Sequence, residues 1–255
     1  MGISLRNVPA IAVIVALVAL FGATYAVAAG QSQPTSTAIV TVLPTPPSGE
    51  GSRVSIDVSK AGSQLATLGG FPFAQAETQR NATPMVSSGG ELRHGAPTTT
   101  NAVSYLQLQN QPTPVTRIGA TMTFSDTRSG SVALVAWQQS LVNSIRAGRL
   151  VGSSIPNAGI HFAADISGWH LGVWDGAASR EVVILRGNYG ATAGVPVSYQ
   201  VDRAGSTATI TDPDGVKSSI TDPRIGEWTG QWATWELYEN NAQQTPATLS
   251  KLWVS

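Results

Sequence analysis

The stretch from Gly159 to Asp175, GIHFAADISGWHLGVWD, constrains the fold more than any other part of the chain. Two runs of alternating apolar residues meet at Ser167-Gly168, a pair typical of the tight turn that closes a β-hairpin. Successive side chains of a strand point to opposite faces, so such runs bury one face and leave the other polar. The sequence therefore predicts a half-buried antiparallel hairpin over residues 159–175.

A two-residue turn at this point fixes which residues face each other across the hairpin. The apolar face is predicted to consist of the pairs Ile166–Trp169, Ala164–Leu171 and Phe162–Val173. On the other face, Asp165 would lie opposite His170, and His161 opposite Trp174, with small residues between them. This pattern is typical of a shallow binding site, and equally of a solvated sheet surface whose tryptophan lies under a loop.

The first 29 residues are a hydrophobic leader rather than part of a folded domain. Arg6 precedes an uncharged apolar run that ends in small residues, Ala26 to Ala29, which is the pattern that signal peptidase recognises. The run is also about long enough to span a bilayer, so an uncleaved membrane anchor is the alternative. In both cases we expect the remainder to be secreted or tethered at the cell surface. Residues 30–52, rich in Pro, Ser and Thr, predict a linker, and residues 53–255 a folded domain.

The composition excludes several classes of protein. The chain has no cysteine, which excludes a lipidated lipoprotein, a disulfide framework and a thiolate metal site. Its 15 basic and 15 acidic residues give no net charge and form no basic cluster, so nucleic acid is not expected as a partner. Membrane contact is expected only through the leader, if it is not cleaved.

Short strand-like runs recur along residues 53–255, each closed by turn residues. Besides the hairpin, strands are predicted at 53–59, 90–94, 103–109, 117–124, 131–137, 180–186, 195–201, 206–211, 216–220, 232–238 and 249–254. One short helix is predicted at 138–150, where Leu141 and Ile145 share a stripe. This pattern predicts an all-β domain, an antiparallel two-sheet β-sandwich with one short helix.

Several motifs carry a resemblance to a known superfamily. They are Gly168-Trp169-His170-Leu171-Gly172-Val173-Trp174, Asp212-Pro213-Asp214-Gly215, Thr221-Asp222-Pro223-Arg224, Trp235-Glu236-Leu237-Tyr238 and Lys251-Leu252-Trp253-Val254. With these motifs, residues 90–255 resemble a concanavalin A-like jelly roll, the lectin and glucanase sandwich. Within that class the region is similar to secreted modules of actinobacteria and tail-associated proteins of their phages. The resemblance implies the fold, but its motifs are structural and do not define an activity.

Glycoside hydrolysis is not expected from this sequence. Glycosidases of this superfamily carry a Glu-x-Asp-x-Glu pattern that places two carboxylates on one face of a strand, and no strand here contains it. Glu236 and Glu239 are three residues apart, which puts them on opposite faces of a strand. Within the resemblance, no hydrolase active site is therefore predicted.

A polysaccharide lyase is the enzymatic alternative that the sequence leaves open. Glu91-Leu92-Arg93, Ile160-His161 and Gly187-Asn188-Tyr189 follow each other in the order of similar motifs in alginate lyases. In this interpretation Arg93 neutralises a uronate carboxyl group, and His161 or Tyr189 removes the neighbouring proton. Gly159 stands where that pattern has a glutamine, so one hydrogen-bond donor is missing.

Metal ligation is a minor alternative, and no other cofactor is expected. His161, Asp165 and His170 would share one face of the hairpin, but a hydrogen bond between Asp165 and His170 explains that pair without a transition metal. Structural calcium has weak candidate ligands in the loops. These are Asp212, Asp214 and Asp222. Asp-Pro steps are turn signals first, and the sequence does not require calcium.

Six of the seven tryptophans fall into two groups, by strand alternation or, for Trp228, by its place in a glycine-flanked loop, and the face of Trp137 is ambiguous. Three share a face with aliphatic residues and are expected in the core: Trp169, Trp235 and Trp253. Three others are candidates for flat platforms on which sugar rings stack: Trp174, Trp228 and Trp232.

These observations together favour a non-catalytic, lectin-like module that binds a polysaccharide or glycan outside the cell. The expected site is the polar face of the hairpin, where Trp174 stacks on the sugar. Four polar residues are expected to bond the hydroxyl groups of the sugar: His161, Asp165, His170 and Arg186. A structural or adhesive module that binds protein, and a lyase acting on a uronate polymer, are the two alternatives.

Overall fold

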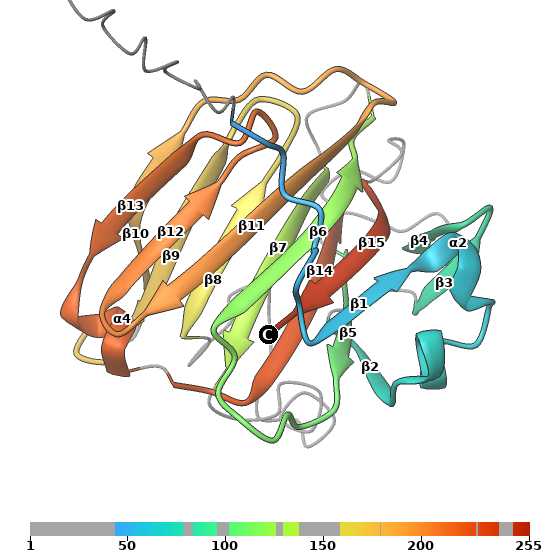
Figure 1. Ribbon diagram of the computed structural model, residues 1–255, viewed down its shortest axis with the longest axis horizontal. Helices are drawn as coiled ribbons and strands as arrows, with labels where there is room; N and C mark the ends of the chain where they lie inside the picture. The colour runs from blue at the N-terminus through green and yellow to red at the C-terminus, as the bar shows by residue number, and fades with distance from the viewer. Residues whose placement is uncertain are drawn as a thin grey trace, which may run out of the picture. The chain divides into compact units, whose positions relative to one another are not determined.

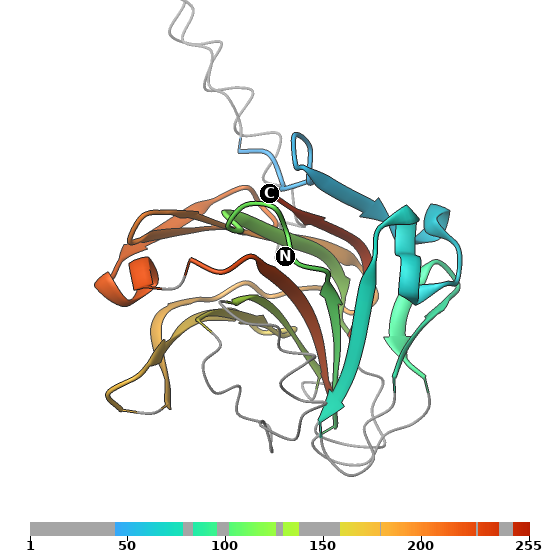
Figure 2. The ribbon, with the colours of Figure 1, turned by 90° about the horizontal axis from the view of Figure 1, so that it is seen from below.

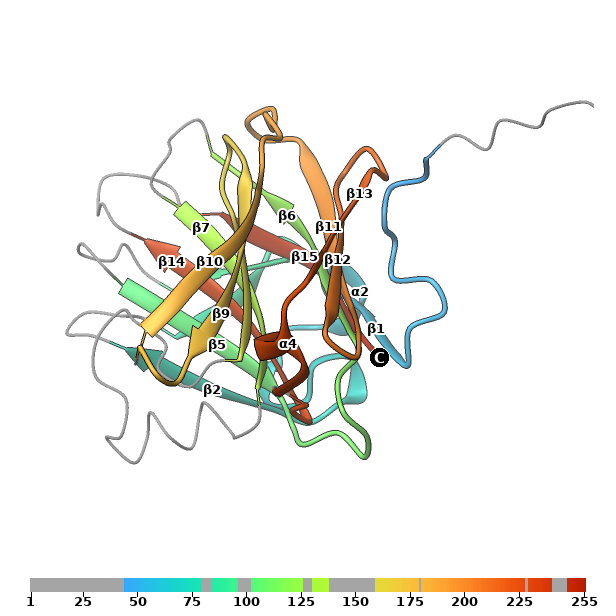
Figure 3. The ribbon, with the colours of Figure 1, turned by 90° about the vertical axis from the view of Figure 1, so that its left-hand side faces the viewer.

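Two antiparallel β-sheets stack face to face and enclose an apolar core (Figure 1, Figure 3). The computed structural model describes residues 44–78, 84–95, 102–125, 130–137, 159–178, 180–227, 229–239 and 247–255. The chain divides into two units, Met1–Val42 and Leu43–Ser255, and all described residues lie in the second. Within them, no helix combines the length and the apolar character that crossing a bilayer requires.

The larger sheet has eight strands in the order β13-β12-β11-β6-β15-β4-β3, with β1 paired to β15. Its strands are β1 (Val54–Asp57), β3 (Met85–Ser88), β4 (Glu91–His94), β6 (Arg117–Thr123), β11 (Pro196–Ala204), β12 (Thr207–Thr211), β13 (Lys217–Thr221) and β15 (Thr248–Val254). Among the described residues, three short helical segments accompany the sheets: α2 (Val58–Ala61), the 3-10 segment η1 (Leu65–Gly70) and α4 (Pro223–Glu227).

The other sheet has seven strands in the order β10-β9-β8-β7-β14-β5-β2. Its strands are β2 (Phe73–Thr78), β5 (Ala102–Leu108), β7 (Gly130–Trp137), β8 (Ile160–Ala164), β9 (Trp169–Asp175), β10 (Arg180–Gly187) and β14 (Trp232–Glu239). Figure 2 shows that both sheets curve in the same sense, so that the outer face of the seven-stranded sheet is concave. We call this surface the concave face.

Aromatic side chains from both sheets meet in the core. Phe162 on β8 packs against Tyr199 on β11, with ring centroids 5.3 Å apart. Trp235 on β14 is fully buried, and its indole Nε1 donates to the carbonyl oxygen of Gly119 on the opposite sheet at 3.0 Å. This bond satisfies the single polar group of a large apolar side chain, so Trp235 ties the two sheets together.

The structure confirms the predicted antiparallel sandwich and contains each of the predicted strands, to within a few residues at their ends. Two strands were missed: β2, because residues 61–84 alternate weakly, and the four-residue β3, which directly follows that stretch. The described residues between 53 and 89 belong to the sandwich, since β1, β2 and β3 each pair with one of its strands. The expected helix at 138–150 lies outside the described residues.

Residues 44–50 lie along the outer face of the eight-stranded sheet (Figure 1). A Cβ at Gly49 would lie 2.7 Å from the Cγ atom of Trp253, and one at Gly215 would lie 2.5 Å from the backbone nitrogen of Thr45. The sandwich therefore includes residues that the composition placed in the linker. Trp253 is buried as expected, but beneath this segment rather than in the core, because it alternates with the core residues Leu252 and Val254.

Candidate functional site

The hairpin that the sequence predicted is present, but its register differs by two residues. His161 pairs with Gly172, and Phe162 pairs with Leu171 rather than with Val173. The connection is longer than two residues because Asp165 to Gly168 all lie in the turn. A shift of two keeps every side chain on its expected face. The two faces were therefore predicted correctly, whereas the residue pairs were wrong.

Asp165 determines the longer turn. Its Oδ1 atom accepts hydrogen bonds from the backbone nitrogens of Ser167 at 2.7 Å and Gly168 at 3.1 Å. The carboxylate thus satisfies backbone donors of the turn, which is the common role of Asp at such positions. The expected pair of Asp165 with His170 does not form, because Ala163 is the residue opposite His170.

The carboxylate that contacts a histidine is that of Glu181, and not that of Asp165 as the sequence suggested. It lies near the start of β10, and its Oε1 atom is 2.9 Å from the Nδ1 atom of His161 on β8. The two strands are separated by β9, so the Glu181 side chain crosses that strand. It does so above Gly172, where a Cβ atom would lie only 1.9 Å from Glu181 Oε1. Glycine at position 172 is therefore a condition for the contact.

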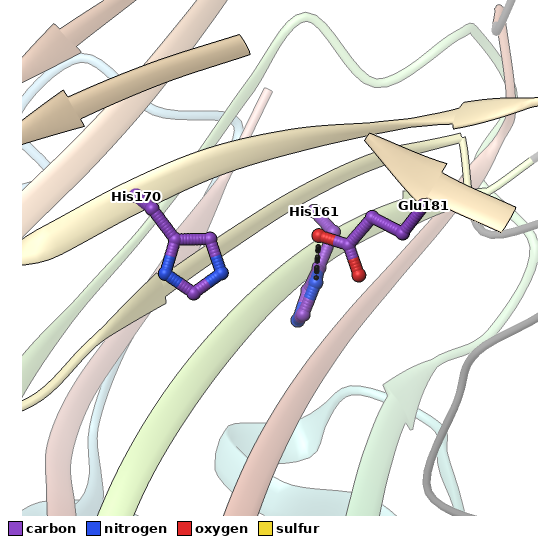
Figure 4. A group of neighbouring side chains, drawn as sticks. All are labelled: His161, His170 and Glu181. Carbon is purple, nitrogen blue, oxygen red and sulfur yellow. Dashed lines mark hydrogen bonds and ion pairs between the residues drawn. The ribbon is translucent and has the colours of Figure 1, made fainter. Parts of the chain in front are cut away.

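His170 completes a cluster of three polar side chains on the concave face. Its ring meets that of His161 edge to face, with centroids 6.2 Å apart. One potential ligand atom from each of His161, His170 and Glu181 lies within 4.8 Å of the others. Figure 4 shows the three side chains, contributed by three adjacent strands, on the same side of the sheet. We refer to them as the His-His-Glu cluster.

The charges in this cluster depend on burial and on the contact between His161 and Glu181. Burial lowers the pKa of His161, but the hydrogen bond and negative charge of Glu181 outweigh burial and raise it overall. Burial acts to raise the pKa of Glu181, and the bond to His161 lowers it overall. The pKa of His170 is lowered by burial and by the charge of His161. The contact therefore favours the charged forms of His161 and Glu181, whereas burial and His161 disfavour the charged form of His170.

Glu236 on β14 adds a second carboxyl group to the concave face. Its side chain is buried, with 6% of the residue exposed, and burial raises its pKa to about 7. Its Oε2 atom is buried without a hydrogen-bond partner, and the charge of Glu181 also raises its pKa. From the sequence, Glu236 was considered in a resemblance motif and, with Glu239, as a hydrolase carboxylate pair that the spacing rejects, and the burial of this carboxyl group was not predicted.

A pocket of about 210 Å³ opens on the same face beside the hairpin turn. Its lining residues are Ser131, Ala163, Ala164, Asp165, Ser167, Gly168, Trp169, His170, Arg186, Gly187 and Asn188. Three residues of the predicted carbohydrate site thus meet here: Asp165, His170 and Arg186. His161 lies next to the pocket through its contact with His170.

Trp174 lies on the concave face but does not present the open platform that we expected. Only 9% of the residue is exposed, and it lies across from Glu181 on β10. Its ring therefore offers little surface on which a sugar can stack. Of the other candidate platforms, Trp232 is half-buried and Trp228 lies outside the described residues.

The residues of the lyase alternative are not assembled. Arg93 lies on β4 of the eight-stranded sheet, where it donates to the Ser88 carbonyl oxygen at 3.1 Å and to Glu91 at 3.2 Å. Tyr189 packs against the core with its ring edge-on to Tyr199. His161 lies on the concave face of the other sheet. The structure thus places the expected neutraliser and the candidate base His161 on different sheets.

Of the three candidate calcium ligands, Asp212 and Asp214 share a turn, whereas Asp222 lies beyond the other end of β13. Asp212 accepts from the backbone nitrogens of Asp214 and Val216 in the turn before β13. Asp222 follows the far end of β13, where its Oδ2 atom accepts from Arg224 at 2.7 Å. Calcium prefers six to eight oxygen ligands. The described residues offer instead, as their one group of three close ligands, two imidazoles and a carboxylate.

Comparisons with known proteins define the fold. No family model matches the chain, and no curated protein matches it in sequence. Among solved structures, the exoplasmic/lumenal domain of VIP36 in a Ca²⁺/Man-bound form matches with a TM-score of 0.55 and 10% identity, over 79% of this chain and 88% of that one. The metal-free carbohydrate recognition domain of Emp46p matches with a TM-score of 0.56 and 11% identity, over 78% and 94%. The chain thus has the concanavalin A-like β-sandwich fold that its motifs implied.

Proposed function

We propose that this domain is a lectin-like module that binds carbohydrate in the pocket beside the hairpin turn. The observation that carries the proposal is the pocket itself, where Asp165, His170, Arg186 and Asn188 converge on the concave face. Sugar sites are concave, with a few convergent polar groups that bond hydroxyls and set orientation. A pocket of about 210 Å³ suits part of one sugar unit rather than a long enclosed ligand.

The polar groups of the pocket suit a neutral, hydroxyl-rich ligand. Arg186 and Asn188 are exposed and offer hydrogen-bond donors, and Asn188 also offers an acceptor. Asp165 uses its Oδ1 atom for the turn, so its Oδ2 atom is the acceptor for a ligand hydroxyl. Because Trp174 is buried, the apolar side of a sugar would contact Ala163, Gly168 and Gly187 in the pocket lining.

The structural neighbours support the same class of ligand. VIP36 was solved in Man- and Man2-bound forms, and the Emp46p domain is a carbohydrate recognition domain. The VIP36 domain is exoplasmic or lumenal, which agrees with the exported location that the leader of this chain suggests. More specifically, we propose that the domain binds an envelope or extracellular polysaccharide and does so without catalysis.

A glycan and polysaccharide array probed with the purified full chain tests this function. Arg186→Ala removes a charged donor from the pocket and is expected to weaken binding by about 10-fold to 100-fold. Arg180→Ala is the matched control, since Arg180 is also exposed on β10 but lies outside the pocket lining. Equal binding by all three proteins would reject this pocket, and absence of binding to any glycan would favour the protein-binding alternative.

A further inference from the structure

The His-His-Glu cluster has the composition of a metal site, and of its three residues the carbohydrate proposal uses only His170. Imidazole nitrogen and carboxylate oxygen are the ligands of Zn²⁺ in protein sites that keep an open coordination position. In those sites the metal–ligand distances are about 2.0–2.2 Å, which places neighbouring ligand atoms roughly 3–3.5 Å apart. We propose that His161, His170 and Glu181 bind one divalent transition metal ion of the zinc type.

The distances within the cluster fit such an ion after a small adjustment. His161 Nδ1 and Glu181 Oε1 are 2.9 Å apart, already close to the separation of two ligands on one ion. Each of the three residues offers a ligand atom, and these atoms lie within 4.8 Å of one another. Because this limit exceeds the roughly 3–3.5 Å between ligand atoms on one ion, binding requires a small approach of the side chains. The ring of His170 is half-buried and lies beside the open pocket, where a change of side-chain rotamer can provide this movement.

The positions of the ligands are set by the sheet rather than by loops. Each residue lies on a different one of the adjacent strands β8, β9 and β10, whose register is fixed by their ladders. Gly172 leaves the space through which Glu181 reaches His161. Ligands on rigid strands keep their geometry better than ligands on loops. The arrangement therefore resembles a prepared binding site more than a chance encounter of side chains.

The surroundings favour a cation and exclude calcium as the preferred ion. Two carboxyl groups, Glu181 and the buried Glu236, act electrostatically on His161. A metal ion between His161 and Glu181 would replace the proton that these two groups share, and its binding would release that proton to solvent. Calcium prefers oxygen ligands only, whereas this cluster supplies two nitrogens. The site is therefore chemically different from one built for the calcium of the VIP36 structures.

Zinc titration by calorimetry on the EDTA-treated and dialysed full chain tests the proposal. We expect one Zn²⁺ per chain with a Kd in the micromolar range or below. His170→Asn and Glu181→Gln are each expected to weaken binding by at least about tenfold, as loss of one ligand does. His94→Gln is the matched control, because His94 is the third histidine of the chain and the chain has no cysteine. Cobalt substitution adds the visible absorption bands of a low-coordinate site.

Absence of zinc binding would overturn the proposal, and so would binding that persists unchanged in His170→Asn and Glu181→Gln. Loss of binding in His94→Gln, with the fold intact by circular dichroism, would place the ion elsewhere and also reject it. Glu181→Gln removes a part-buried contact with His161, so His170→Asn, which leaves that contact in place, provides the decisive variant if Glu181→Gln does not fold. The zinc titration contains no glycan, so its outcome is independent of the proposed carbohydrate function.

Discussion

The carboxylate of Glu181 lies so close above Gly172 that a Cβ atom at that position would come within 1.9 Å of its Oε1 atom. Gly172→Ala should therefore displace Glu181, break its bond to His161 and destabilise the domain by roughly 1–3 kcal/mol. Zinc binding should be lost with it. Urea unfolding and zinc calorimetry measure the two effects.

Gly176→Ala is the control for this substitution, since a Cβ atom added at Gly176 would have no neighbour within 4 Å and the φ of this residue is not positive. It should leave both stability and zinc binding unchanged. A Gly172→Ala protein that behaves like Gly176→Ala would show that Glu181 does not need the space above the strand.

Glu236 should make stability fall as the pH rises. Its pKa is about 7 in the fold and 4.5 in the unfolded reference, so the folded state holds the proton more tightly. The contribution of Glu236 to the free energy of unfolding is therefore largest below pH 4.5. This contribution decreases by roughly 3 kcal/mol in total as the pH rises from 4.5 to above about 7. Glu236→Gln should remove most of this decrease.

Urea unfolding of metal-free protein at pH 5 and pH 8 checks this sign. Glu50→Gln changes an exposed carboxyl group and should keep the wild-type pH dependence. If Glu236→Gln shows the same loss of stability between the two pH values as wild type, the neutral state of Glu236 is not the cause.

Arg224 should stabilise the fold above acidic pH. It donates to Asp175 on β9 at 2.9 Å and to Asp222 at 2.7 Å, joining the seven-stranded sheet to α4. The pKa of Asp175 is lowered by the backbone bond from Ala178 and by Arg224, and that of Asp222 by Arg224. A carboxylate whose pKa is lower in the folded state stabilises the fold only while it is ionised. The stabilisation from these two ion pairs is therefore present at neutral pH and is lost as the pH falls below about 4.

Arg224→Ala should accordingly lower the urea midpoint at pH 7 and have a smaller effect at pH 3. Arg180→Ala, which removes an exposed charge from the next strand, is the control. A deficit that is the same at both pH values would indicate that Arg224 acts through packing rather than through its ion pairs.

Gly49 allows the N-terminal segment of the domain to be tested. Gly49 and Gly51 both have positive φ, 76° and 72°, but only a Cβ at Gly49 would collide with the indole of Trp253. Gly49→Ala should destabilise the domain by about 1–3 kcal/mol more than Gly51→Ala does. Thermal unfolding followed by tryptophan fluorescence compares them, and equal effects would mean that the segment does not rest on Trp253.

Alternation along the strands predicts the fold and the two faces of the hairpin, because a buried sheet face repeats every second residue. The register depended on the turn, and Asp165 was the signal: an Asp two residues before Ser167 favours a longer, side-chain-capped connection. His170 and Arg186, expected on one face, do lie opposite each other on β9 and β10.

Other parts of the site depend on contacts that no local pattern records. Glu181 reaches His161 across a strand, and the only sequence signal was a glycine in the middle of β9, which marks a close approach. Trp253 alternates like a surface residue of β15, but its indole lies against Gly119, donates to Gln200 and is approached by Gly49 from the other end of the chain. Trp174 is buried on a face that alternation alone would leave open.

The segment beneath which Trp253 lies also defines the side on which the chain enters the domain. Residues 44–50 approach over the convex surface, whereas the pocket and the His-His-Glu cluster open on the concave one. This segment and the pocket thus lie on opposite sides of a sandwich two sheets thick. A substitution in residues 44–50 can therefore alter the stability of the domain without altering the lining of the pocket.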